Sequence, residues 1–134
     1  MKDQTLAWRV RAIRGATTVD NDSTSAIQVA VNELLQAIEA QNQEVLDLSE
    51  VVSVIFSVTD DLKAVFPAAI ARQRPGWQSI PLLDVQHMQV QDGLPQCIRC
   101  LIQFNTPCPV AAIHHVYLKE AKILRPDLIV TSVS

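Results

Sequence analysis

Five side chains of this sequence have the chemistry that binds small carboxylic acids. They are Arg14, Arg72, Arg99, Arg125 and Tyr117, the only tyrosine of the chain. A guanidinium group binds a carboxylate through two parallel hydrogen bonds, and a phenol hydroxyl can donate another. An arginine also places positive charge where negative charge develops in a transition state, without proton transfer. If these side chains converge, the sequence predicts a pocket for a small molecule with more than one carboxylate.

A single α/β domain over residues 1–134 is predicted to position these side chains, because a chain of 134 residues fits one domain. Apolar and polar residues alternate over residues 8–13, which predicts a half-buried strand that ends at Gly15. Apolar residues then recur every three or four positions, which predicts an amphipathic helix to about Gln41. The polar run at residues 20–25 supplies candidates for its N-cap.

Four further strands are expected to complete a mixed sheet of about five strands. Residues 51–58 are apolar on both faces, which is typical of a strand covered on both sides. Pro67 is expected to open a short helix that ends before Pro75-Gly76. We expect the remaining strands at residues 77–85, 97–105 and 115–118, a helical turn at 110–114, and a flexible tail at 131–134.

The composition limits the classes of partner. A net charge of −3 argues against nucleic acid and anionic membranes, which attract proteins rich in lysine and arginine. Hydrophobic residues make up 49% of the chain, and the mean hydropathy of +0.17 is high for a small soluble monomer. We therefore expect apolar surface that either completes the core or contacts other copies of the chain.

The cysteines and histidines do not form a recognisable metal site. Cys97 and Cys100 fall within one predicted strand and would face opposite sides of it, and no second cysteine pair completes a zinc site. His114 and His115 are adjacent, which favours a polar helix end over a shared ion. With three glycines, no phosphate-binding loop is indicated, so we expect no metal and no cofactor. An odd cysteine count without an apolar leader favours the reducing cytoplasm.

Separate blocks of the sequence resemble the monofunctional AroH-class chorismate mutases. The blocks are Ile13-Arg-Gly-Ala-Thr-Thr-Val19, Asp61-Leu-Lys-Ala-Val-Phe-Pro-Ala68, Cys97-Ile-Arg99, and His115-Val-Tyr-Leu118 followed by Leu124-Arg-Pro-Asp-Leu128. The similarity keeps its register from about residue 9 to 128. It implies a homotrimer with a central pseudo-barrel and an active site at each subunit interface. It also implies the cofactor-free rearrangement of chorismate to prephenate, on the route to phenylalanine and tyrosine.

The resemblance also implies roles for individual residues. Arg99 would donate to the ether oxygen and touch a substrate carboxylate, while Arg14 and Tyr117 would bind a carboxylate together. These three would face Phe66 and Arg72 of an adjacent chain. The other implied substrate contacts are positive charge from Arg72 and Arg125 and apolar walls from Phe66, Ala68, Leu83 and Leu124.

Two positions depart from the family pattern. The family usually has a glutamate that accepts a hydrogen bond from the ring hydroxyl of the substrate, and His87 occupies that position. Three residues earlier stands Asp84, where cysteine or serine is common. Either Asp84 accepts from the hydroxyl with His87 beside it, or neutral His87 accepts and Asp84 only orients it. Ala69 replaces a frequent lysine near the entrance, which should weaken substrate attraction modestly.

Two other functions compete with the mutase reading. The departure at His87 is compatible with a catalytically weak or inactive relative that only binds a small carboxylate. A trimeric imine deaminase of similar shape also uses an interfacial arginine. The presence of Arg14, Arg99 and Tyr117 favours the mutase.

Overall fold

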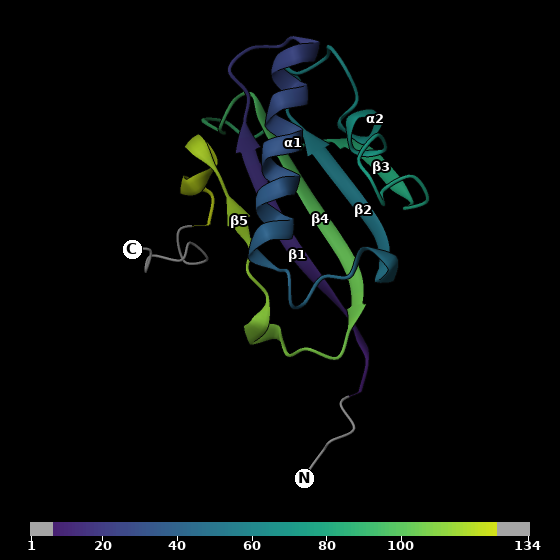
Figure 1. The fold of residues 1–134 in the computed structure, drawn as a ribbon. Coiled ribbons are helices and arrows are strands. Elements are labelled where there is room, and N and C mark those ends of the chain that lie inside the picture. Colours follow the sequence, from purple (N-terminus) through teal and green to yellow (C-terminus); the bar gives the residue numbers. More distant parts are fainter. Residues whose placement is uncertain (1–6, 126–134) are drawn as a thin grey trace.

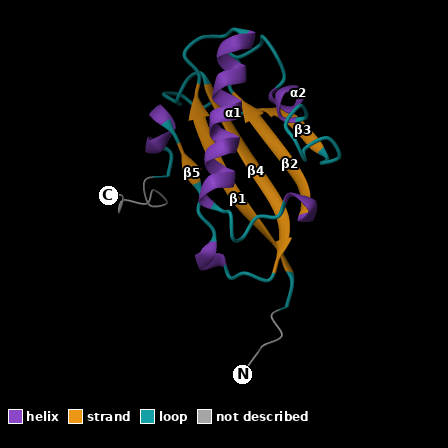
Figure 2. Ribbon diagram, in the orientation of Figure 1, coloured by secondary structure: helices purple, strands orange, loops and turns teal. Residues whose placement is uncertain are grey.

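The computed structural model describes residues 7–125, and its elements follow the predicted order (Figures 1 and 2). The strands are β1 (Arg9–Thr18), β2 (Val51–Val58), β3 (Leu82–Gln86), β4 (Cys97–Thr106) and β5 (Val116–Tyr117). The helices are α1 (Thr24–Gln41) and α2 (Pro67–Ala71), with the 3-10 helices η1 (Leu48–Glu50), η2 (Val110–Ala112) and η3 (Lys119–Ile123). None of the helices within residues 7–125 is long and apolar enough to cross a membrane. The predicted tail at residues 131–134 lies outside the described residues.

The strands form one mixed sheet in the order β3-β2-β4-β1-β5, which confirms the predicted five-stranded sheet. β4 runs antiparallel to β2 and β1 on either side, and the edge strands β3 and β5 run parallel to their neighbours. One row of paired residues crosses the whole sheet through Val85, Ser57, Arg99, Ala16 and Tyr117. Directly paired residues point to the same side of a sheet, so these side chains share one face.

Helix α1 covers the opposite face of the sheet (Figure 1). Ser23 caps the helix, since its side chain accepts a hydrogen bond from Ala26 N at 3.1 Å. The predicted apolar stripe is wholly buried against the sheet, which confirms the helix and its end at Gln41. We call this side the helix-covered face. The other side, which carries Arg14, Arg99 and Ser57, is the open face.

Gly15 does not end β1, contrary to the prediction, because the strand continues to Thr18. A Cβ atom on Gly15 would lie 2.8 Å from Cδ1 of Ile38 and 3.3 Å from Cδ1 of Leu34. The absence of a side chain at Gly15 therefore allows the close approach of α1 to the sheet, and the backbone of Gly15 pairs as in any strand.

Strand β3 begins at Leu82, later than the predicted start at Trp77. Trp77 is wholly buried and begins a turn that closes with a hydrogen bond from Ile80 N to Trp77 O at 3.2 Å. Its indole Nε1 donates to Oε2 of Glu39 on α1 at 2.9 Å. The first residues of the predicted strand, from Trp77 to Ile80, thus form a turn, and Trp77 and Ile80 are apolar because they pack in the core.

The open face leaves apolar side chains uncovered in a single chain. Val10 is 57% exposed, Leu83 57% and Val85 39%. The strand predicted at residues 8–13 exists, but its buried side chain is Ile13, whereas Val10 is exposed. β2 has the predicted bounds, yet within this chain only its helix-covered face is deeply buried. Part of the apolar excess therefore lies on the open face.

Candidate active site

The three predicted residues Arg14, Arg99 and Tyr117 line one hollow of about 400 Å³ on the open face. Arg99 comes from β4 in the middle of the sheet, Arg14 from β1, and Tyr117 from β5 at the edge. Both arginines are exposed, so their charges are available to a bound anion. Two guanidinium groups and one phenol hydroxyl can together bind a molecule with two carboxylates.

The phenol ring of Tyr117 is fixed by packing. Tyr117 is 8% exposed and forms a small apolar cluster with Ala16 and Ala121, against which Leu124 packs. The chain turns from β5 into η3 at Lys119, whose φ of 53° lies in the left-handed region. This turn brings η3 back into contact with β1 beside the hollow.

His87 lies at the end of β3, on the same side as Arg99, and the two residues line a neighbouring hollow of about 220 Å³. Its backbone N–H donates to Val58 O at 2.8 Å, and its Nδ1 lies 2.6 Å from the Ser57 hydroxyl. Burial and the positive charge of Arg99 lower the pKa of His87. The imidazole is therefore neutral near pH 7 and bonds to Ser57 as a neutral ring.

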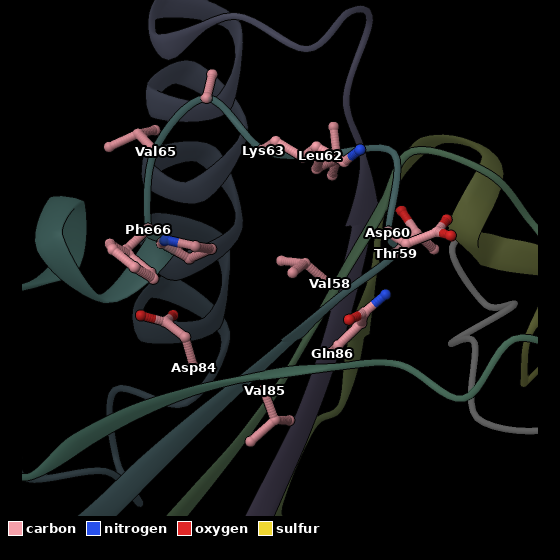
Figure 3. A pocket seen from close by; sticks show the side chains of 12 residues that line it. Val58, Thr59, Asp60, Leu62, Lys63, Val65, Phe66, Asp84, Val85 and Gln86 are labelled. Atoms are coloured by element: carbon pink, nitrogen blue, oxygen red, sulfur yellow. The ribbon is translucent and has the colours of Figure 1, made fainter.

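Asp84 and Phe66 line a different hollow, of about 720 Å³, between β3 and the loop before α2 (Figure 3). The carboxylate of Asp84 points toward Phe66, whereas Val85 points away. The Oδ1 atom of Asp84 accepts a hydrogen bond from Ala68 N at 3.0 Å. Burial raises the pKa of Asp84, and the Ala68 N–H and the positive charge of Arg72 oppose that rise.

The expectation that Asp84 and His87 lie side by side is wrong within one chain. Asp84 is paired with Phe56 and shares the helix-covered face with it, whereas His87 bonds to Ser57 on the open face. The partner of His87 Nδ1 is Ser57, so Asp84 does not orient the imidazole either. Side chains three residues apart in an extended chain point to opposite sides, which explains the separation.

The remaining predicted contacts are spread over the surface of the chain. Phe66 is 69% exposed and Leu83 57% exposed, while Ala68 is buried in α2. Arg72 is exposed at the C-terminal end of α2. Within this chain, Phe66, Ala68 and Arg72 are absent from the residues that line the hollow of Arg99. The positive charge of Arg125 acts on His115, and Leu124 packs near Tyr117.

The sequence prediction missed two polar residues near the hollow. Ser57 bonds to His87, and His115 Nδ1 accepts a hydrogen bond from the backbone N–H of Arg14 at 2.9 Å. His115 was expected at the start of a strand, with the His114-His115 pair interpreted as a polar helix end, and Ser57 was expected only as part of a strand. The positions of Ser57 and Arg99 in adjacent central strands are the one signal that could have identified the serine.

The three cysteines of the chain all lie among the described residues. Among residues 7–125, no group of three or more His, Cys, Asp or Glu side chains is arranged to hold a metal ion. Cys97, Cys100 and Cys108 are free, and the first two are buried in β4. Complete burial raises the pKa of Cys100 to about 12, so its thiol stays protonated.

Comparison with known proteins places this geometry in a family. Residues 10–128 match the family model for chorismate mutase type I. The chain is 42% identical to chorismate mutase AroH of Bacillus subtilis over 91% of this chain and 94% of the relative. It is 46% identical to chorismate mutase AroH of Thermus thermophilus over 89% and 96%.

A solved structure is also similar. The chorismate mutase from Clostridium thermocellum superposes with a TM-score of 0.78 at 39% sequence identity, covering 84% of this chain and 98% of that one. The region that the family model matches contains all three hollows described above, since it extends over nearly all the described residues. The chain belongs to the chorismate mutase type I family.

Proposed function

We propose that this chain catalyses the rearrangement of chorismate to prephenate, the step toward phenylalanine and tyrosine. The observation that carries this is the grouping of Arg14, Arg99 and Tyr117 around one hollow, in a chain of the chorismate mutase family. Chorismate has two carboxylates, and this hollow offers two guanidinium groups and a phenol to bind them. The reaction is a [3,3] shift within one molecule, so it needs no nucleophile or general base.

The first contribution to the rate is conformational restraint. Chorismate is flexible and must adopt a compact, diaxial, chair-like shape before its bonds can rearrange. Arg14 and Tyr117 would bind one carboxylate from β1 and β5, while Arg99 touches another substrate oxygen from β4. Holding these groups in place removes orientational freedom before the reaction begins.

The second contribution is electrostatic. As the C–O bond breaks, negative charge develops on the ether oxygen. The guanidinium of Arg99 would donate hydrogen bonds to that oxygen, and these bonds strengthen as the charge grows. An interaction that is stronger in the transition state than in the ground state is the kind that raises the rate.

We also propose that each active site forms between two chains of a homotrimer. Arg14, Arg99 and Tyr117 line one hollow, whereas Phe66 lines another, so a single chain holds the predicted site residues as two separate sets. The exposed apolar side chains of the open face give a further reason to expect contact with other copies. A site completed by the next chain would explain both observations.

Mixed trimers test the interfacial site. Arg99→Ala and Arg72→Ala each damage a different half, so each pure variant should have low activity. After unfolding and refolding together in equal amounts, about a quarter of the sites would combine an intact Arg99 with an intact Arg72. Recovery of activity on mixing supports the interface. A mixture no more active than the average of its components, or a monomeric mass in solution, contradicts it.

We further propose that Asp84 and His87 reach one site from different chains. Asp84 shares its hollow with Phe66 and feels the charge of Arg72, whereas His87 shares its hollow with Arg99. Asp84→Asn retains an acceptor and the bond to Ala68, while Asp84→Ala loses both. A fall in kcat/KM for Asp84→Ala, partly restored in Asp84→Asn, supports contact with the substrate hydroxyl. An unchanged kcat/KM for Asp84→Ala removes Asp84 from that role and leaves His87.

The function itself is tested by loss of chorismate absorbance on addition of the protein. Turnover separates the mutase from a relative that only binds small carboxylates, because binding alone leaves the absorbance constant over time. Binding of chorismate without turnover would therefore overturn the proposed function. A cytoplasmic location stays a prediction, supported by the three free cysteines.

A further inference from the structure

His115 contacts Arg14 through a bond that the predicted reaction does not use. The backbone N–H of Arg14 donates to Nδ1 of His115 at 2.9 Å. Strand β5 has two residues and pairs with Gly15 and Ala16, so its pairing stops short of Arg14. On the far side of this pairing, Leu118 N donates to Ala16 O at 2.9 Å. If β5 were longer, one of its backbone carbonyl groups would accept the hydrogen bond from the Arg14 N–H. The imidazole of His115 accepts that bond instead.

The segment that carries His115 is tied to α1 by Asn42. Asn42 is 1% exposed, and its Nδ2 donates to His114 O at 2.9 Å. Its Oδ1 accepts from His114 N at 2.8 Å. The backbone N–H and C=O of His114 are therefore both hydrogen-bonded to Asn42. Tyr117 follows His115 by two residues. Arg14 and Tyr117 consequently depend on one short stretch of chain for their relative position.

We propose that His115 is a positioning residue, whose neutral imidazole holds Arg14 and, through β5, Tyr117 in the geometry that binds a substrate carboxylate. This inference rests on the proposed function. The bond needs a free lone pair on Nδ1, so the ring must carry its proton on Nε2. A doubly protonated ring would turn an N–H toward the N–H of Arg14, and the bond would be lost.

The surroundings of His115 keep the ring neutral. Burial lowers its pKa, and the positive charges of Arg14 on β1, of Arg125 after η3 and of neighbouring His114 lower it further. Asn42, the C-cap residue of α1, contributes an uncharged side chain to this segment. Because the folded chain favours the neutral ring, the Arg14 bond persists above the ordinary histidine pKa of 6.5. It is lost as the pH falls below that value and reaches the lowered pKa.

The kinetic test compares two variants of His115 with a matched control. Asparagine can place its Oδ1 near the position of Nδ1, so His115→Asn keeps an acceptor that does not titrate. At about pH 8, His115→Ala should lower kcat/KM for chorismate about tenfold, mainly through KM, because the carboxylate contacts move. His115→Asn should recover most of that loss. The control His114→Ala removes the neighbouring exposed imidazole, leaves the backbone bonds to Asn42, and should stay within about twofold of wild type.

The pH profile separates positioning from a merely structural role. As the pH is lowered from about 8 until the ring of His115 protonates, wild type should lose more kcat/KM than His115→Asn, since His87 titrates in both proteins but His115 in only one. Equal profiles for the two proteins would overturn the proposal. A His115→Asn variant that is folded yet no better than His115→Ala would do the same.

A spectroscopic measurement is independent of turnover. In protein labelled with 15N-histidine, the Nδ1 of His115 should show the resonance of an unprotonated nitrogen at about pH 7.5. A proton on that nitrogen would overturn the proposal. If wild type fails to turn over chorismate while this resonance is as expected, the proposed function fails, although His115 still bonds to Arg14.

Discussion

Replacing Glu39 with alanine should destabilise the fold, because this carboxylate joins α1 to the segment after α2. Its Oε2 accepts a hydrogen bond from Trp77 Nε1 at 2.9 Å, and its Oε1 accepts from Arg74 Nη2 at 3.2 Å. Trp77 is wholly buried, so no water can replace the lost acceptor unless the structure opens. Alanine would therefore leave a buried indole N–H without its partner.

The size of the effect follows from these two contacts. An unsatisfied buried donor costs about 1–3 kcal/mol. The Arg74 and Glu39 side chains are 17% and 31% exposed, so solvent screens their ion pair, which adds up to about 1 kcal/mol. We expect Glu39→Ala to lower the free energy of unfolding by roughly 1–4 kcal/mol. For a domain of this length each kcal/mol lowers Tm by roughly 3–5 °C.

Thermal unfolding followed by circular dichroism measures this loss. Protein concentration must be held constant across variants, because the stability of an oligomer depends on it. Glu39→Gln keeps a carbonyl acceptor for Trp77 and should lose less stability than Glu39→Ala. The control is Glu33→Gln, on the same helix, whose Oε1 lies 3.8 Å from Lys119 Nζ with the Glu33 side chain 52% exposed. A Glu39→Ala protein that melts together with this control would refute the reasoning.

Three further predictions concern the site and the core. Arg99→Ala should lower kcat by at least ~10²-fold, and Arg99→Lys should rescue little of it, because lysine lacks the planar fork; near-normal turnover by the alanine variant would remove Arg99 from its role. Gly15→Ala should lower the free energy of unfolding in urea by about 1–3 kcal/mol, since the added methyl would meet Ile38 Cδ1 at 2.8 Å, and an unchanged midpoint would contradict that clash. A thiol reagent should modify half-exposed Cys108 before Cys100, whose pKa is raised to about 12 by burial; simultaneous modification in the folded protein would argue against this order.

The long helix and the central strands could be predicted because their signals are local. The cap at Ser23 and the apolar period of α1 lie within the element itself, as does the β-branched run of β2. The predicted end of β1 and the predicted start of β3 were wrong because tertiary contacts determine the residue types at these positions. Gly15 is needed for contact with α1, and Trp77 is apolar because it packs in the core against α1. Neither cause is visible in the flanking residues.

The sequence could predict the kind of ligand that the site binds, because that depends on the residue types alone. Arginines and a tyrosine suffice to suggest a carboxylate pocket, and the register then brings Arg14, Arg99 and Tyr117 together. The roles of Ser57 and His115 depend on hydrogen bonds between residues 30 and 101 positions apart. Such contacts require the strand order and the register, which no local pattern contains. The separation of Asp84 from His87, by contrast, follows from the local alternation of side chains in an extended chain.

The two-residue strand β5 has a consequence for the order in which the domain folds. Its anchors are distant in sequence, since Asn42 lies 72 positions from His114 and Arg14 lies 101 positions from His115. Closing loops of this length is entropically costly, so we expect β5 to dock after α1 has packed on the sheet. A chain that has already formed its core would then still lack Tyr117 at the hollow. We expect the pocket to be the last part of the domain to assemble and the first to open in local unfolding.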